Sequence, residues 1–432
     1  MKRFALGLAL LGLVALGAPA TAIIGTVDDV PAASLLLPYF EVDLNSPTGI
    51  TTLFSINNAS ASAAVAHVTI WSDLSVPVID FDVYLTGYDV QTINLRDIIV
   101  SGILPRTADD GADPADTISP QGPFSQDINF PGASGPCVAP YVNPVITGNF
   151  LTYVQRALTG LGAAPATGSG SRCYGVPYGD GIARGYVTID SVTQCSLLFP
   201  GDVGYFEGGI PDFRNILWGD YFYVEPAQNF AQGETLVHLE ADAQLFVPGD
   251  YTFYGRYVGF TGIDGREPLA SSFASRYVNG GAFDGGTEFI VWRDTKQAQN
   301  DFACAAFPPS PFPLNETQVM AFDEAEDATE LCYIFGGGVI SPPSDPEDPT
   351  CFPWEAGRYA MEGDLASPYD FGWLYMNLNF FNAAAPEVGG AGVGHDGHEG
   401  RGPVRGRLRR DSARQRLLEP AERPHRRRSL RP

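Results

Sequence analysis

The dominant pattern along the chain is a short alternation of apolar and polar residues that ends at Gly, Pro, Asn or Asp. A period of two is typical of β-strands, because successive side chains point to opposite faces of a sheet. The pattern predicts strands at 50–56, 66–71, 80–85, 90–95, 185–190, 220–224, 236–247, 251–260, 288–294, 317–322 and 373–380. Turn residues separate the first four of these strands at spacings typical of hairpins, as in NNAS at 57–60 and LTGYD at 85–89.

One segment, NFLTYVQRALTG at 149–160, has a helical pattern instead. Phe150, Leu151, Val154 and Leu158 fall on one face of a helix, Asn149 is a suitable N-cap, and Gly160 is suited to end it. Many short strands and a single helix predict an all-β fold, namely an antiparallel β-sandwich. The pattern leaves open whether there is more than one sandwich or one elaborated sandwich.

Residues 51–97 contain a strand, an N-A-S turn, a strand that ends in W-S-D, and two further strands. In this order they resemble an immunoglobulin-like or fibronectin-like module of bacterial surface proteins. A second Trp-x-Asp strand, FIVWRD at 289–294, is similar to VTIWSD at 68–73, and each is followed by a strand that begins with Gln. Two explanations stay open, duplication of a module and chance similarity between amphipathic strands.

Composition divides the chain into segments. Stretches rich in Gly and Pro are the expected boundaries or long loops. We predict a signal peptide at 1–22, an N-terminal β-sandwich module at 23–105, an acidic Gly/Pro-rich loop at 106–136, a disulfide-containing β-rich region at 137–335, a Pro/Gly-rich loop at 336–370, a terminal strand at 371–386 and an Arg-rich, disordered tail at 387–432.

The first 22 residues have the pattern of a secretory signal peptide. Lys2 and Arg3 precede an apolar run that is too short to span a bilayer, and Ala20-Thr21-Ala22 supplies an A-x-A cleavage site. We expect cleavage after Ala22, followed by a location in the bacterial periplasm, at the cell surface or outside the cell. No later apolar run approaches the length of a transmembrane helix.

The cysteines fit an oxidising compartment. There are six, Cys137, Cys173, Cys195, Cys304, Cys332 and Cys351, and no C-x-x-C pair occurs among them. We therefore expect up to three disulfides rather than a zinc site or a redox dithiol. The spacing leaves the pairing open, since six cysteines allow fifteen arrangements.

The body of the chain is strongly acidic. Residues 23–400 contain 12 basic and 47 acidic residues, a net charge of −35. Such a surface repels phosphate backbones, so we expect no nucleic-acid partner for the body. Two clusters, TADDGADPADT at 107–117 and FDEAEDATE at 322–330, contain enough carboxylates to bind Ca²⁺. Neither has the register of a twelve-residue calcium loop, and a solvated acidic loop is the better interpretation.

The sequence contains little that indicates catalysis. It has no G-x-S-x-G elbow, H-E-x-x-H, P-loop or strand-linked G-x-G-x-x-G. His67 lies in a predicted strand, where a satisfied or half-exposed histidine is the expected interpretation. His238 and Glu240 share a strand face by the period of two and form a candidate acid–base or metal-binding pair, with an ordinary polar pair as the alternative. We assign no catalytic, cofactor-binding or metal-binding residue.

Longer stretches also look familiar. ARGYVTID (183–190), ILWGDYFYV (216–224), FAQGETLVHLEAD (230–242) and REPLASSFASRYVNGGAF (266–283) resemble a group of secreted bacterial β-rich proteins to which no activity is assigned. The resemblance covers most of residues 24–380 and implies export. With it, we predict a non-enzymatic structural or surface protein of the cell envelope. The alternatives are an extracellular module that binds a glycan or a calcium-dependent ligand, and a secreted hydrolase whose site is not recognised.

The last segment differs from everything before it. Residues 387–432 contain no Phe, Tyr, Trp, Ile, Met, Lys, Asn, Thr or Cys, whereas residues 401–432 contain 12 arginines. Such a composition is what GC-rich DNA gives when it is translated in the wrong frame, and we expect a frameshift artefact after about residue 386. The alternatives are a basic tail bound to the acidic body or to anionic surfaces, and a nucleic-acid arm. Arg-rich, apolar-poor sequence is expected to be disordered in every case. If the frame is shifted, the chain lacks its last strands, and the domain that contains WLYMNLNF (373–380) is expected to have an unpaired edge that is prone to aggregation.

Overall fold

The computed structural model describes residues 30–105, 146, 148–162, 172–243, 252–258, 264–267, 269–270, 272–279, 286–294, 302–303, 318–331, 351–378 and 414–415. The predicted signal peptide, the acidic cluster at 107–117, three of the cysteines (Cys137, Cys304 and Cys332) and all but two residues of the Arg-rich tail lie outside this part of the chain. None of the helices in these ranges has the length and apolar character that a bilayer crossing requires.

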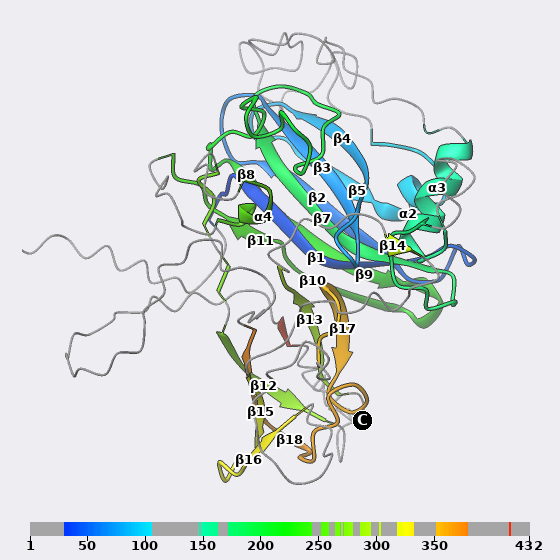
Figure 1. Ribbon diagram of the computed structural model, residues 1–432, viewed down its shortest axis with the longest axis vertical. Helices are drawn as coiled ribbons and strands as arrows, with labels where there is room; N and C mark the ends of the chain where they lie inside the picture. The colour runs from blue at the N-terminus through cyan, green and yellow to red at the C-terminus, as the bar shows by residue number, and fades with distance from the viewer. Residues whose placement is uncertain are drawn as a thin grey trace, which may run out of the picture.

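Two antiparallel sheets form a sandwich-like body, in the upper half of Figure 1. Sheet one has the order β11 (Val237–Leu239), β1 (Ser34–Asp43), β7 (Ile182–Val192), β3 (Ala64–Ser72) and β4 (Pro77–Leu85). Sheet two has the order β10 (Phe230–Thr235), β9 (Asp220–Glu225), β2 (Thr51–Asn58) and β5 (Val90–Asn94), and β8 (Leu217–Trp218) also pairs with β2. The all-β, antiparallel sandwich-like prediction is confirmed; the immunoglobulin-like type of the sandwich stays a prediction.

Smaller sheets make up the rest of the described chain, and β13 and β17 lie between the sandwich and the four-stranded sheet (Figure 1). The four-stranded sheet has the order β12 (Ser272–Val278), β18 (Phe371–Asn377), β15 (Gln318–Phe322) and β16 (Ala328–Glu330). Strand β13 (Glu288–Trp292) pairs with β17 (Ala356–Ala360) and with β19 (Arg414–Gln415), and β14 (Phe302–Ala303) pairs with β6 (Arg172–Cys173). The helices are α2 (Leu95–Ile99), α3 (Gly148–Leu158), α4 (Gly255–Val258) and the 3-10 turn η1 (Pro226–Gln228).

The sandwich is completed by strands far apart in the sequence. β7, from the predicted second region, lies between β1 and β3, and β9 pairs with β2. The strands of residues 30–105 therefore do not form a sheet pair of their own, so the expected boundary near residue 105 does not separate two sandwiches. Almost every residue of β1 and β3 is buried, which places these strands in the middle of the molecule.

A proline and a glycine shape the centre of sheet one. The pairing of β1 with β7 shifts between Leu37 and Phe40, so Pro38 lies at an irregularity, where a strand tolerates the missing N–H. Gly185 on β7 lies opposite this irregularity. A Cβ there would come within 1.9 Å of the carbonyl oxygen of Trp71, so only glycine permits the close approach of β3.

Three predicted elements differ from the structure at their ends. The helix starts at Gly148 rather than after Asn149, and Gly160 follows it with a left-handed φ of 71°, as expected of a C-terminal glycine. The predicted strand at 90–95 ends at Asn94, whose side chain accepts a hydrogen bond from Arg96 N (3.0 Å) and caps α2. The segment predicted as one strand at 236–247 is a strand only at 237–239, and residues 244–250 lie outside the described chain.

One further prediction is wrong. The aromatic segment at 251–260 contains the short helix α4 rather than a strand, because its side chains pack against sheet one instead of forming a ladder. β18 is paired on both sides, with β12 and with β15.

Candidate functional site: a buried polar face

The strands of sheet one separate two kinds of side chain. On β3, Ala66, Val68 and Ile70 belong to the sandwich core, whereas His67, Thr69 and Trp71 lie on the opposite face. The same alternation on β7 places Thr188 and Asp190 beside them. Both faces are buried, which is unusual for a polar one, since buried polar groups require hydrogen-bond partners.

Strand register brings four polar residues into one row. Ser34 on β1 is opposite Asp190 on β7, Asp190 is opposite His67 on β3, and His67 is opposite Asp82 on β4. All four have no more than 1% of their surface exposed. The row therefore crosses four neighbouring strands and is covered by other parts of the chain.

Segments from later in the sequence supply the cover. The hydroxyl of Tyr205 donates to Asp190 (2.7 Å), and that of Tyr254 donates to the same carboxylate (2.9 Å). Arg266 forms ion pairs with Asp190 (3.5 Å) and with Asp264 (3.2 Å). Ser34 also donates to Asp190 and accepts from Arg266. This half of the face, which we call the Arg266 network (Ser34, Asp190, Tyr205, Tyr254, Asp264 and Arg266), satisfies its charges internally.

The other half is the His67 cluster, which consists of His67, Thr69, Asp80 and Asp82. His67 Nδ1 is hydrogen-bonded to Asp82 Oδ1 (2.9 Å), and its Nε2 lies 3.8 Å from Asp80 Oδ2. Asp82 also accepts a hydrogen bond from the backbone N–H of Ser196 (3.1 Å). Three buried polar atoms of this cluster, His67 Nε2, Thr69 Oγ1 and Asp80 Oδ2, have no hydrogen-bond partner among the residues that the structure describes.

The electrostatics of the cluster favour bound protons. Burial lowers the pKa of His67, but the hydrogen bond to Asp82 and the negative charges of Asp82, Asp80 and Asp190 outweigh burial and leave that pKa above its ordinary value. Burial raises the pKa of Asp80 to about 6, although the charge of His67 opposes the shift. The cluster can therefore hold protons on the imidazole of His67 and on the carboxyl group of Asp80.

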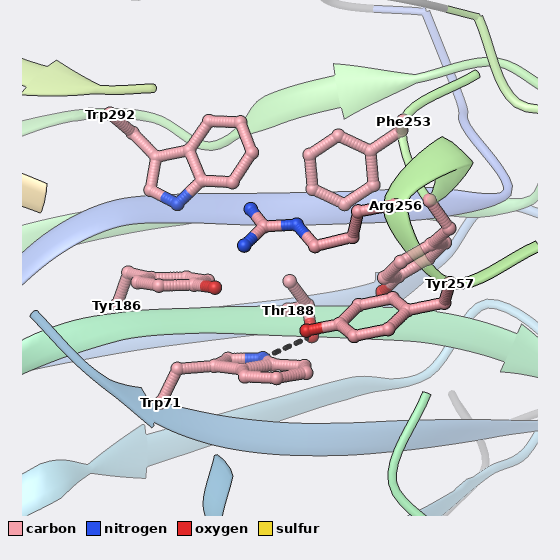
Figure 2. Close-up of a pocket in the computed structure, with 8 residues that line it drawn as sticks. Trp71, Tyr186, Thr188, Phe253, Arg256, Tyr257 and Trp292 are labelled. Atoms are coloured by element: carbon pink, nitrogen blue, oxygen red, sulfur yellow. Dashed lines mark hydrogen bonds between the residues drawn. The ribbon is translucent and has the colours of Figure 1, made fainter. Parts of the chain in front are cut away.

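A small aromatic pocket opens on the same face, two residues along β3 (Figure 2). It is lined by Trp71, Tyr186, Thr188, Phe253, Tyr254, Arg256, Tyr257 and Trp292. Trp71 stacks on Tyr186 with ring centroids 5.7 Å apart, and its indole N–H donates to Thr188 (2.8 Å). The space inside that a water-sized sphere can reach is about 10 Å³, which is room for about one water molecule. This volume excludes a metabolite from the pocket as it stands.

The guanidinium of Arg256 fills the centre of that pocket (Figure 2). It forms ion pairs with Asp294 (3.0 Å) and Glu355 (2.9 Å), and it lies 5.6 Å from the ring of Tyr257 and 5.8 Å from that of Trp292. These contacts are cation–π and charge-assisted interactions, which strengthen when water is excluded. Arg256 therefore ties α4 to the residues that flank β13 and β17. Trp71 and Trp292, the tryptophans of the two similar Trp-x-Asp strands, both line this pocket.

The other candidate residues have ordinary surroundings. His67 is fully buried rather than half-exposed. His238 is buried on β11 and hydrogen-bonds through Nδ1 to the carbonyl of Val30 (2.8 Å). Because β11 ends at Leu239, Glu240 lies outside the strand, and the period-of-two argument does not apply to it.

Metal binding has little support in the described chain. The acidic cluster at 322–330 forms the turn between β15 and β16, where Asp323 accepts from the N–H groups of Ala325 (2.8 Å) and Asp327 (2.9 Å). Within the ranges given above, no group of three or more His, Cys, Asp or Glu side chains could hold a metal ion. The other cluster, at 107–117, lies outside those ranges.

Cys173, Cys195 and Cys351 are the cysteines of the described chain. All three are disulfide-bonded, so none of them is a free thiol. The pairing of the six cysteines stays a prediction.

Sequence reasoning missed most of the buried face. Asp80, Asp82, Asp190, Arg256 and Arg266 were not singled out, although one signal was available. On three neighbouring strands, polar residues replace the aliphatic ones at every second position, as in AHVTIW, DFDVYL and GYVTID. No family model, curated protein or solved structure matches the chain. Any statement about its function must therefore come from its own residues.

Proposed function

We propose that this chain is an exported, non-enzymatic structural or surface protein of the bacterial envelope. The observation that carries the proposal is that two buried arginines, Arg256 and Arg266, and the partly exposed Arg358 form ion pairs between distant segments. Arg266, Arg256 and Arg358 each join segments far apart in the sequence. Arg358 on β17 pairs with Glu41 on β1 (3.1 Å), and Arg256 pairs with Asp294 and Glu355.

Such pairs serve rigidity more than chemistry. A buried ion pair contributes little net stability by itself, but removal of one partner leaves an uncompensated charge at a cost of about 3–5 kcal/mol. The arrangement therefore penalises any separation of the sandwich from the segment that contains β13 and β17. A sandwich held by ion pairs between distant segments suits a protein that has to remain folded outside the cytoplasm. The predicted signal peptide at 1–22 points to the same location.

The test is expression of the full chain in a bacterium, with and without residues 1–22. The expected result is a protein outside the cytoplasm, whose intact mass shows that its first residue is Ile23. Protease added to intact cells is expected to reach this protein if it lies at the cell surface, but not if it lies just beneath the outer surface. The purified protein is expected to turn over no ester, glycoside, peptide or phosphoester substrate. Cytoplasmic retention would contradict export, and turnover that disappears in His67→Gln would favour the hydrolase alternative.

A second candidate function, binding of a glycan, is favoured by one exposed sheet face. On β18, Phe371 and Trp373 are 46% and 45% exposed, and they share a face because they are two residues apart. Arg276 on β12 stacks over Trp373 at 5.0 Å and pairs with Glu324. Aromatic rings beside a charged pair can stack on the apolar faces of sugars while charged groups bind hydroxyls.

Affinity electrophoresis in gels that contain bacterial polysaccharides tests this candidate. Trp373→Ala is expected to abolish retardation, whereas Phe222→Ala, which removes a similarly exposed ring on β9, is expected to leave it unchanged. Equal retardation of both variants and the unmodified protein would count against the face. Thermal unfolding with millimolar Ca²⁺ or with a chelator tests the calcium-dependent alternative, because a ligand of the native state raises the midpoint.

A further inference from the structure

We infer that the His67 cluster is a pH-sensitive latch, which holds the covering segment 195–213 against sheet one when the cluster carries a proton and loosens that segment when the proton is lost. The inference goes beyond the proposed structural role, because it adds a response to the surroundings. It depends on geometry in the best-buried part of the molecule.

The latch has two points of attachment to the covering segment. The N–H of Ser196 donates to Asp82 Oδ2 (3.1 Å), the same carboxylate that binds His67. At the other end, Tyr205 donates to Asp190 (2.7 Å), and its ring lies 5.6 Å from the ring of His67. Because His67 contacts both attachment points, its protonation state bears on the whole segment.

The charges around His67 leave it as the cation of the cluster. Strand β4 contributes Asp80 and Asp82, and β7 contributes Asp190. The covering segment adds Tyr205 and Asp202, the second of which acts on Asp80. Beyond Asp190 lie Tyr254, Arg266 and Asp264, where Arg266 forms ion pairs with both carboxylates. Arg266 is occupied in this way, and among the described residues the cation in contact with Asp80 and Asp82 is the protonated imidazole of His67.

The sign of the pH effect follows from the direction of the pKa shifts. The pKa of His67 is raised in the folded protein, so its stabilisation is complete below the ordinary value of about 6.5 and is lost as the pH rises through the folded value. The pKa of Asp80 is raised from 3.8 to about 6, so the folded state also becomes less favourable as the pH rises from about 4 to 6. Both groups make the latch tighter in acid than at neutral or alkaline pH.

Loss of the proton weakens the cover for a physical reason. With a neutral imidazole, Asp80 loses the positive charge that lies 3.8 Å from its carboxylate, and within the described part of the chain Asp80 Oδ2 has no hydrogen-bond partner. Opening of 195–213 then relieves the desolvation cost of the carboxylates.

The first experiment measures the proton directly. Histidine ring signals of the full chain are followed by NMR from pH 4 to 9, and the signal absent from His67→Gln is assigned to His67. The matched control is His238→Gln, which removes the other buried histidine of sheet one. The expected result is a His67 titration midpoint above 6.5. A His67 that titrates below 6.5, or that stays neutral throughout, would overturn the inference.

The second experiment follows the covering segment. Hydrogen exchange is measured by mass spectrometry at pH 5 and pH 8, with times corrected for the intrinsic rate of exchange. Peptides from 195–213 are expected to exchange at least several-fold faster at pH 8 in the unmodified protein and in His238→Gln, with no such difference in His67→Gln. The same corrected rates at both pH values in the unmodified protein would overturn the latch.

A variant that keeps the histidine guards against a His67→Gln protein that does not fold. Asp80→Asn removes one carboxylate facing Nε2 and leaves the Nδ1 bond to Asp82 in place. It is expected to shift the His67 titration to lower pH and to reduce the acid preference of 195–213. An unchanged titration midpoint in this variant would contradict the role given to Asp80.

Discussion

The Arg266 network and the His67 cluster lie side by side on one sheet face, yet they treat buried charge in opposite ways. In the network, Asp190 receives hydrogen bonds from Ser34, Tyr205 and Tyr254 and lies beside a guanidinium that is charged at every ordinary pH. In the cluster, the cation among the described residues is the imidazole of His67, whose charge depends on pH. One sheet face therefore contains both a network whose cation stays charged at every ordinary pH and a cluster whose cation depends on pH.

The largest expected effect comes from removing the cation of the Arg266 network. Arg266→Met leaves Asp190 and Asp264 buried without their cation, so we expect the free energy of unfolding to fall by about 3–5 kcal/mol. Denaturant unfolding followed by tryptophan fluorescence measures it.

The matched control for this prediction is Arg276→Met, whose ion pair with Glu324 is half-exposed and is expected to cost less than about 1 kcal/mol. Similar losses in the two variants would show that burial of the Arg266 network does not determine its contribution.

Asp82→Asn is expected to have the next largest effect. The carboxylate binds both His67 and the N–H of Ser196, and an amide oxygen can replace only the neutral part of these interactions. We expect a loss of about 1.5–3 kcal/mol at pH 5, the usual range for hydrogen bonds to charged groups. The loss is expected to be smaller at pH 8, because the protonated fraction of His67 falls as the pH rises. A loss that is the same at both pH values would remove the distinction between the two halves of the face.

How much of this could be predicted from the sequence depends on what each residue contacts. The strands could be predicted because apolar–polar alternation is a local pattern. The end of α3 could be predicted from Gly160 for the same reason. The burial of the polar positions in AHVTIW could not be predicted in this way, because polar residues at every second position of a strand normally face solvent. Here they face Tyr205, Tyr254 and Arg266, which lie more than 130 residues away in the chain. No local sequence pattern predicts that these distant residues cover the polar face of the strand.

The same reason explains the segment at 251–260. Its aromatic residues have high strand propensity, but Phe253 and Tyr254 are buried against sheet one and Arg256 is held by Asp294 and Glu355. Tertiary contacts therefore outweigh local preference. The charged groups of the candidate site were beyond prediction because acidic residues are abundant in the chain, and only register shows which carboxylates face a histidine.

Asp80→Asn is expected to act in the opposite direction to the first two variants. Burial raises the pKa of Asp80 to about 6, so the charged form is the unfavourable one in the folded state. At pH 8 we expect the variant to be more stable than the unmodified protein by about 1–2 kcal/mol, since one pKa unit corresponds to about 1.4 kcal/mol and the side chain is 12% exposed. At pH 4 the two proteins are expected to be equal. A variant that is less stable at pH 8 would show that the charge of Asp80 is stabilising.

The smallest effects, and the sharpest comparison, come from two threonines that face each other across β3 and β7. Thr69 and Thr188 are direct partners, and both are almost completely buried. Thr188 accepts the indole N–H of Trp71 (2.8 Å), whereas the hydroxyl of Thr69 has no partner. Thr188→Val is expected to cost about 1 kcal/mol, because it leaves a buried indole N–H unbonded, and Thr69→Val to cost nothing or to stabilise by up to about 1 kcal/mol. A comparable loss in both variants would mean that Thr69 binds an ordered water, and the cluster would then be solvated internally even with its cover closed. A neutral or stabilising Thr69→Val would instead indicate a cluster without such a water, in which the hydrogen bond to Asp82 and the nearby carboxylates hold the proton on His67 against the cost of burial.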